Sequence, residues 1–183
     1  MELKIYVLKR NKVLDYAIPI AVFVALMALS SRIMIPLPFT PVPITLQVLF
    51  VILSGLILGS KRAAITQASY LGLILSGLPL TAYGLAGPAA FISPTAGYLL
   101  AFLPAAYCVG LYSEKFKNNF HFFIAGIIGI IIIYLGGTSW LAIYLGDINK
   151  AWRAGVAPFI LVDLIKAIIA IIIYKGCKSL DKK

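Results

Sequence analysis

Long apolar runs, separated by short polar or basic segments, follow one another along this sequence. Windows of about 19 residues predict six apolar helices, which run from Val13 to Ser31, Ile44 to Gly59, Ala63 to Leu78, Thr95 to Ser113, Phe122 to Leu145 and Gly155 to Tyr174. A helix that crosses a bilayer needs roughly 20 apolar residues. The pattern therefore predicts an all-α integral membrane protein with six transmembrane helices, built as a single domain over residues 1–183.

Composition excludes several other classes of protein. Apolar and aromatic residues make up 62% of the chain and charged residues 12%, and the mean hydropathy is +1.01, which is far from the composition of a soluble domain. The chain has no phosphate-binding G-x-x-x-x-G-K-[ST] run, no H-E-x-x-H motif, and two cysteines, Cys108 and Cys177, without metal-site spacing. We therefore expect no ATPase or other enzyme, and no metal ion or cofactor in this chain.

Basic residues alternate between the two sides of the predicted helices. Of the 16 Lys and Arg residues, which give a formal net charge of +10, Lys166 falls within the sixth helix and Arg32, Lys150 and Arg153 lie on one side. The remaining twelve lie on the other side, at Lys4, Lys9, Arg10, Lys12, Lys61, Arg62, Lys115, Lys117, Lys175, Lys178, Lys182 and Lys183. The positive-inside rule then predicts cytoplasmic N and C termini, with connections 32–44, 79–94 and 146–154 facing outward. The position of the basic residues is thus explained by the orientation of the chain in a lipid bilayer. We therefore expect no nucleic-acid partner despite the net positive charge.

Two of the outward connections are apolar and rich in proline or glycine. The first, PLPFTPVPIT from Pro36 to Thr45, has four prolines in eight residues, and the second, LPLTAYGLAGPAAFISPT from Leu78 to Thr95, is also uncharged. Proline holds itself and the residue before it in extended conformations, so we expect both connections to be ordered. They are either lids over a site or connectors that rest on the lipid headgroups.

The sixth predicted helix carries two charges, Asp163 and Lys166, among aliphatic residues. At positions i and i+3 they share one helix face. Asp163 lies about 12 Å inside the outer boundary near Gly155 at roughly 1.5 Å per residue, and Lys166 lies about one turn deeper. A lone charge at this depth costs at least about 3 kcal/mol, so such residues face a bundle interior, a cavity or each other. Because Asp163 offers acceptors and Lys166 offers donors, they suit a ligand head with both N–H and C=O groups. The alternative is an ion pair that fixes helix packing.

Other polar and small residues are weaker candidates. Near the outer ends of the predicted helices lie Thr45, Gln47, Thr95, Tyr98, Trp140 and Tyr144. Tyr and Trp also anchor helices at membrane interfaces, so these residues are either anchors or ligand contacts. The first helix carries a stripe of small residues, Ala17, Ala21 and Ala25, which favours close helix packing, either within this bundle or against a partner.

Four motifs resemble the biotin-specific substrate-binding component of energy-coupling factor (ECF) transporters. They are TPVPITLQ (Thr40 to Gln47), GLPL (Gly77 to Leu80), SPTAGYLLAF (Ser93 to Phe102) and PFILVDLIKA (Pro158 to Ala167), and the resemblance extends over essentially the whole chain. It implies a multi-pass protein of a prokaryotic cytoplasmic membrane that captures biotin from outside. It also implies association with a transmembrane coupling protein and two cytoplasmic ATPases, which would account for the missing phosphate-binding motif.

The resemblance also implies roles for individual residues. Asp163 and Lys166 match the polar residues that bind the ligand, Tyr98 and the lid loops match the surrounding pocket, and the stripe Ala17, Ala21 and Ala25 matches the contact with the coupling protein. We expect Asp163 to accept hydrogen bonds from the ureido N–H groups of biotin, while Lys166 donates to the ligand or keeps Asp163 ionised. The apolar part of biotin would lie against walls such as Tyr98 and Tyr83.

The sequence departs from that family at the outer edge of the expected pocket. After GLP the family usually has a glycine-rich loop with a basic residue, and GPTGGY is more typical than SPTAGY, whereas here the loop reads LTAYGLAGPAAF with Leu85 near the basic position. The contact to the carboxylate of biotin is therefore left to water, to backbone N–H groups, or to Arg32 or Arg153.

Three other functions follow from the same residues. They are a substrate-binding component for another vitamin, a proton-coupled carrier that works alone with Asp163 as its titrating group, and a structural assembly protein that binds no small molecule.

Overall fold

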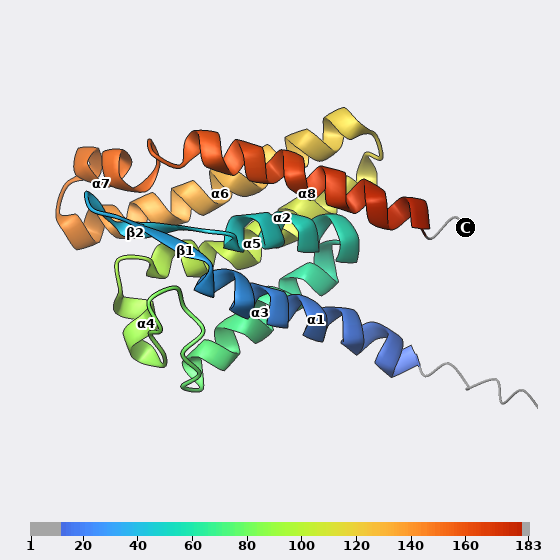
Figure 1. Ribbon diagram of the computed structural model, residues 1–183, viewed down its shortest axis with the longest axis horizontal. Coiled ribbons are helices and arrows are strands. Elements are labelled where there is room, and N and C mark those ends of the chain that lie inside the picture. The colour runs from blue at the N-terminus through green and yellow to red at the C-terminus, as the bar shows by residue number, and fades with distance from the viewer. Residues whose placement is uncertain (1–11, 181–183) are drawn as a thin grey trace, which may run out of the picture.

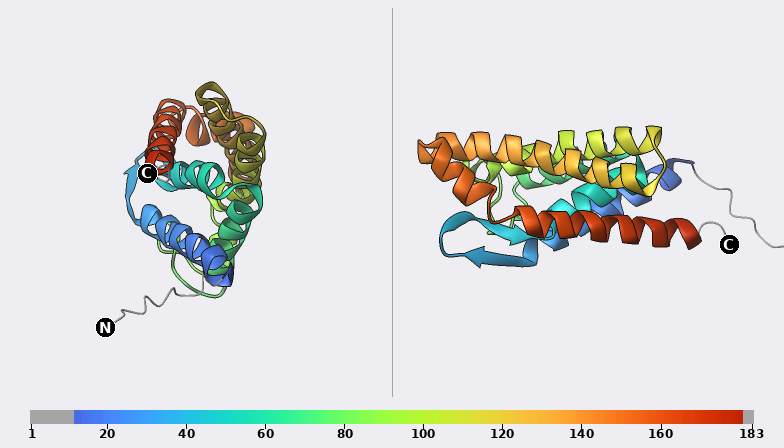
Figure 2. Two further views of the ribbon diagram at one scale, coloured as in Figure 1. Left: turned by 90° about the vertical axis from the view of Figure 1, so that its right-hand side faces the viewer. Right: turned by 90° about the horizontal axis from the view of Figure 1, so that it is seen from above.

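The computed structural model describes residues 12–180 and is mostly helical (Figure 1). Six long helices lie within these residues: α1 (Lys12–Arg32), α2 (Gln47–Leu58), α3 (Ser60–Leu75), α5 (Ala96–Lys115), α6 (Asn119–Leu145) and α8 (Ile160–Leu180). Each overlaps one predicted helix, and Figure 2 shows them bundled together along the long axis of the molecule. By length and hydropathy, three of the described helices, α1, α5 and α6, are able to cross a membrane on their own. A fourth span results if α8 is joined to α7 (Ile148–Gly155) across a bend of 47°.

The expectation of an all-α fold is wrong between α1 and α2. There β1 (Met34–Leu37) and β2 (Thr40–Thr45) form an antiparallel hairpin in which Met34 pairs with Thr45 and Ile35 with Ile44. The prolines predict the extended backbone, and proline is tolerated here because neither strand is central in a sheet. The pairing of the two strands joins residues on opposite sides of a turn, and the local hydrophobic pattern did not predict it.

Two short helices also lie within connections that were expected to be loops. They are α4 (Pro88–Ile92) and α7. Gly146 ends α6 in the left-handed conformation at φ 68°, and the Asp147 carboxylate caps α7 by accepting hydrogen bonds from the backbone N–H groups of Asn149 and Lys150. Glycine and aspartate are favoured at these two positions. The bonds from the N–H groups of Lys150 and Asn149 lower the pKa of Asp147.

The turn between α2 and α3 is tighter than the sequence predicts. Gly59, at φ 78°, is the one residue between the helices, and Lys61 and Arg62 lie in the first turn of α3 rather than in the loop. The N-terminus of α3 is capped from α5, because the Glu114 carboxylate accepts hydrogen bonds from the backbone N–H and the hydroxyl of Ser60.

The start of α1, the end of α8 and the α2–α3 and α5–α6 turns all lie at one end of the molecule (Figure 1). The hairpin, α4 and α7 lie at the opposite end, with Arg32, Lys150 and Arg153. This arrangement agrees with the predicted alternation of basic residues for the described part of the chain. The described residues do not include five of the basic residues in that prediction, Lys4, Lys9, Arg10, Lys182 and Lys183.

Helix α2 lies at the centre of the bundle and contacts α1, α3, α5, α6 and α8. Nine of its 12 residues are buried, which is why it is apolar around most of its circumference. At about 1.5 Å per residue it spans only about 18 Å, well short of a bilayer core of about 30 Å. Its surroundings, rather than its own length, therefore keep its backbone away from lipid.

Gly110 allows the α2–α3 turn to pack directly on α5. A Cβ atom added at Gly110 would lie 2.4 Å from the backbone nitrogen of Ser60. We expect Gly110→Ala to lower the free energy of unfolding by about 1–3 kcal/mol through overpacking, and to lower the midpoint of thermal unfolding in detergent.

The matched control is Gly72→Ala, in the interior of α3, where an added Cβ meets nothing within 4 Å. That substitution should be neutral or raise stability by about 0.5–1 kcal/mol, since alanine favours the helix. Equal midpoints for the two variants would contradict the role assigned to Gly110.

Candidate ligand-binding site

A cavity lies at the N-terminal end of α2, where the hairpin, the segment 81–82 and α5, α6 and α8 meet. Eight polar residues line it: Thr45, Gln47, Thr81, Thr95, Tyr98, Tyr134, Asp163 and Lys166. The apolar part of the lining comes from Val42, Pro43, Val48, Ala82, Leu99, Phe102, Ile133, Gly155 and Phe159. The two proline- or glycine-rich connections thus both contribute walls.

The cavity lies at the point where the chain changes from strand to helix, and β2 and the first turn of α2 both line it. The chain enters α2 as extended β2 and becomes helical at Gln47. At membrane depth, backbone without helical hydrogen bonds is tolerated where it is buried in protein or lines a polar cavity. The short α2 and the extended strand before it therefore create the site.

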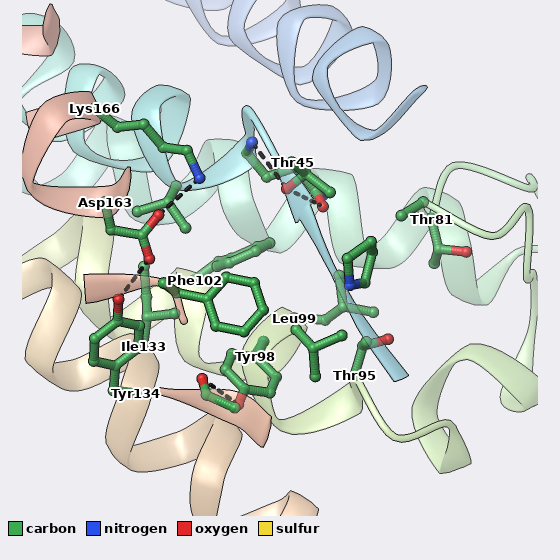
Figure 3. Close-up of a pocket in the computed structure, with 17 residues that line it drawn as sticks. Thr45, Thr81, Thr95, Tyr98, Leu99, Phe102, Ile133, Tyr134, Asp163 and Lys166 are labelled. Carbon is green, nitrogen blue, oxygen red and sulfur yellow. Dashed lines mark hydrogen bonds and ion pairs between the residues drawn. The ribbon is translucent and has the colours of Figure 1, made fainter. Parts of the chain in front are cut away.

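The two charges of α8 face each other in the wall of this cavity (Figure 3). Lys166 Nζ lies 2.7 Å from Asp163 Oδ1, and the Tyr134 hydroxyl donates to Asp163 Oδ2 at 2.8 Å. Asp163 is 2% and Lys166 6% exposed. Because both carboxylate oxygens have donors and the ammonium group has an acceptor, the charges are compensated at a depth where neither could stand alone.

Local structure places this pair at the cavity. The 47° bend between α7 and α8 starts α8 inside the protein, so that Asp163 lies in its first turn. The positive end of the helix dipole there favours a carboxylate, and Lys166 follows three residues later on the same face. Each group keeps bonding capacity, since a carboxylate accepts about four hydrogen bonds and an ammonium donates three.

The sequence analysis did not single out Tyr134. It stands on α6 after a run of isoleucines, in the interior of a 27-residue helix. An interfacial anchor belongs near a helix end, so a tyrosine at this depth was the available signal for a polar partner in the bundle.

Tyr98 shapes the cavity with its ring more than with its hydroxyl. The hydroxyl donates to the Gly155 carbonyl at 2.9 Å. A Cβ added at Gly137 would come within 2.2 Å of the ring, so that glycine provides the space for it. Tyr98 therefore joins α5 to the end of α7 and presents an aromatic wall.

Gln47 and Thr45 form a second polar group in the lining. The Thr45 hydroxyl lies 3.4 Å from Gln47 Oε1 and accepts a hydrogen bond from the Gln47 backbone N–H at 3.3 Å. The remaining lining hydroxyls bond locally, since Thr81 donates to the Leu85 carbonyl at 2.9 Å and Thr95 lies 3.1 Å from the Ser93 hydroxyl.

Six of the eight predicted ligand contacts come together in the cavity, and two lie outside it. Tyr83 is 46% exposed and does not line the cavity. The Trp140 indole N–H donates to the Ser93 carbonyl at 2.8 Å, on a different face of α6. Tyr144, named as an anchor or contact, is exposed near the end of α6.

The arrangement is suited to holding a molecule rather than transforming it. A compensated ion pair with spare donors and acceptors stands beside aromatic and aliphatic walls, as in many small-molecule sites. Among residues 12–180, no group of three or more His, Cys, Asp or Glu side chains lies close enough to hold a metal ion.

Proteins of known sequence and structure resemble this chain over most of its length. The biotin transporter BioY of Thermotoga maritima is 41% identical over 161 residues, which cover 87% of this chain and 94% of that protein. A probable biotin transporter BioY of Pyrococcus horikoshii is 40% identical over 154 residues, or 84% of this chain and 90% of that protein.

A solved structure has the same fold. The crystal structure of the S-component for biotin from an ECF-type ABC transporter matches with a TM-score of 0.85 at 28% sequence identity, covering 93% of this chain and 94% of that one. A model of the BioY family matches residues 7–183. The resemblance drawn from the four sequence motifs is therefore confirmed, and the chain belongs to the BioY family.

Proposed function

We propose that this chain is the substrate-binding subunit of an ECF-type transporter, and that it captures biotin outside the cell for uptake across the cytoplasmic membrane of a prokaryote. The buried Asp163–Lys166 pair in the wall of an otherwise largely apolar cavity carries the proposal. Relatives that are 40–41% identical are biotin transporters by name, which supports biotin over another vitamin.

The polar group of the cavity complements the ureido ring of biotin. That ring has two N–H donors and one carbonyl acceptor. Asp163 accepts from the N–H groups with the lone pairs that Tyr134 and Lys166 leave free, and Lys166 donates to the carbonyl with its remaining protons. The apolar ring and chain of biotin lie against Phe102, Leu99 and Tyr98.

The membrane arrangement proposed here has six spans. We count α2 and α3 as spans although they are short. The hairpin and the other connecting segments carry the chain across the rest of the membrane. By the positive-inside rule, the end with Lys61, Arg62, Lys115 and Lys117 is cytoplasmic, together with both termini. The hairpin, α4, α7 and the cavity then lie toward the outside.

Helix α1 supplies the contact with the transmembrane coupling protein. Ala17, Ala21 and Ala25 are all exposed on it, and small residues allow a second helix to approach closely in lipid. The coupling protein and two cytoplasmic ATPases complete the transporter and supply the energy.

Arg32 is the better candidate for the carboxylate of biotin. Its guanidinium donates to the Pro79 carbonyl and lies 3.5 Å from the place of a Cβ on Gly84. The charge of Arg32 is thus held beside the segment that contributes Thr81 and Ala82 to the cavity. Gly84, which Arg32 approaches, directly precedes Leu85. Arg153 instead lies on α7, in the electrostatic field of Asp147.

Asp163→Asn tests the ureido contact, because the amide has the same shape but lacks the charge. We expect the affinity for biotin to fall about 10- to 100-fold, as one charge-assisted hydrogen bond contributes about 1.5–3 kcal/mol. Titration calorimetry on the purified protein measures it, and an affinity equal to that of the parent would refute the assignment.

Arg32→Gln tests the carboxylate contact. Binding of biotin should weaken about three- to ten-fold, as for a partly exposed charge-assisted pair. Binding of biotin amide, which has no carboxylate, should weaken less, because the lost bond to the Pro79 carbonyl affects both ligands alike. The matched control is Arg153→Gln, for which we expect no change with either ligand. Equal losses for biotin and its amide would exclude a contact between Arg32 and the carboxylate.

Ala21→Trp tests the helix α1 contact. A bulky side chain in place of a small one should reduce co-purification with the coupling protein about ten-fold through overpacking, with biotin binding unchanged. Ile143→Trp, at a position 76% exposed on α6, is the control for bulk at the lipid face. Similar recovery of the complex from both variants would place the contact elsewhere.

A further inference from the structure

Tyr70 lies in α3, outside the cavity lining, yet it bonds to two parts of the cavity wall. Its side chain is fully buried. Its hydroxyl donates to the Leu80 carbonyl at 2.7 Å and accepts a hydrogen bond from Gln47 Nε2 at 2.8 Å. Gln47 lines the cavity at the start of α2, and Leu80 directly precedes the lining residues Thr81 and Ala82.

The chemistry of these groups fixes the orientation of the Gln47 side chain. A carbonyl can only accept a hydrogen bond, so the single Tyr70 proton must go to Leu80. The Tyr70 oxygen then accepts, and only the amide nitrogen of Gln47 can donate to it. This leaves Gln47 Oε1 on the other side, near the Thr45 hydroxyl, as an acceptor at the cavity.

The same hydroxyl helps to hold the segment 78–87, which covers part of the cavity. Two side chains fasten this segment to the rest of the protein, Arg32 at the Pro79 carbonyl and Tyr70 at the Leu80 carbonyl. Backbone bonds hold its two ends, from the Leu78 N–H to the Leu73 carbonyl, from the Gly87 N–H to the Ile74 carbonyl, and from the Ala90 N–H to the Gly87 carbonyl. Of these partners, Tyr70 also bonds Gln47, a residue that lines the cavity.

We propose that Tyr70 is a positioning residue that links the orientation of Gln47 to closure of segment 78–82 over the cavity. A bond between Gln47 and Tyr70 orients the hydroxyl toward Leu80, and the anchored Leu80 holds Thr81 and Ala82 in the wall. A change in the hydrogen bonding of Gln47 at the cavity therefore alters, through the Tyr70 hydroxyl, how firmly segment 78–82 is held over the cavity. The biotin part of this inference rests on the proposed function, whereas the link itself does not.

Tyr70→Phe removes both hydrogen bonds and keeps the ring. The reporter is the rate at which a maleimide labels an Ala82→Cys thiol, in the full chain with Cys108→Ala and Cys177→Ser. Without ligand, we expect labelling to be about ten-fold faster in Tyr70→Phe, since the unanchored segment opens more often. With biotin, dissociation should also be faster, with little change in the association rate.

Ser54→Ala is the matched control. The Ser54 hydroxyl is fully buried and bonds Gln67 across α2 and α3, away from the cavity lining, so its loss destabilises the same helix pair. We expect it to leave labelling and dissociation unchanged. If Tyr70→Phe labels at the parent rate, or if Ser54→Ala accelerates labelling equally, the proposed link is wrong.

Gln47→Glu tests the link from the cavity side, and without any ligand. A carboxylate accepts but cannot donate, so the Tyr70 proton would turn to it and leave the Leu80 carbonyl. Labelling of the Ala82→Cys thiol should then accelerate although the tyrosine is intact, and an unchanged rate would overturn the proposal. Because this measurement uses no biotin, its result is independent of which ligand the cavity takes.

Discussion

The buried pair of Asp163 and Lys166 is the interaction on which the rest of the structure depends. Removing a charge from water costs several kcal/mol unless partners replace the water. Here the partners are the other charge, the Tyr134 hydroxyl of α6 and the N-terminal dipole of α8. Together they determine how α8 docks on α6, and they require the bend that lets α8 begin inside the protein.

The space beside this pair exists because α2 is short. A longer apolar helix would set aliphatic side chains where Thr45 and Gln47 now line the cavity. Instead, extended β2 carries Thr45 to the edge of the cavity, and Gln47 begins the helix beneath it. The proline-rich connection thereby serves the site directly, by preventing helix where the cavity has to be.

The sequence predicts the long helices well because hydrophobic runs of span length have few other solutions in a membrane protein. It also singled out Asp163 and Lys166, since charges are rare and costly in such a helix. The hairpin was missed, because strand pairing depends on residues across a turn rather than on local pattern. Tyr134 and Tyr70 were missed for a different reason: a tyrosine in an apolar helix does not reveal, without tertiary structure, what its hydroxyl reaches.

The cavity has a thermodynamic consequence for the protein that contains it. Side chains that line a cavity pack against fewer neighbours than side chains in a filled core, and this lowers the stability of the folded chain. A molecule that binds the folded state alone returns that stability in proportion to the logarithm of its concentration. The fraction of the chain that is folded at equilibrium therefore rises with the concentration of any molecule that the cavity binds.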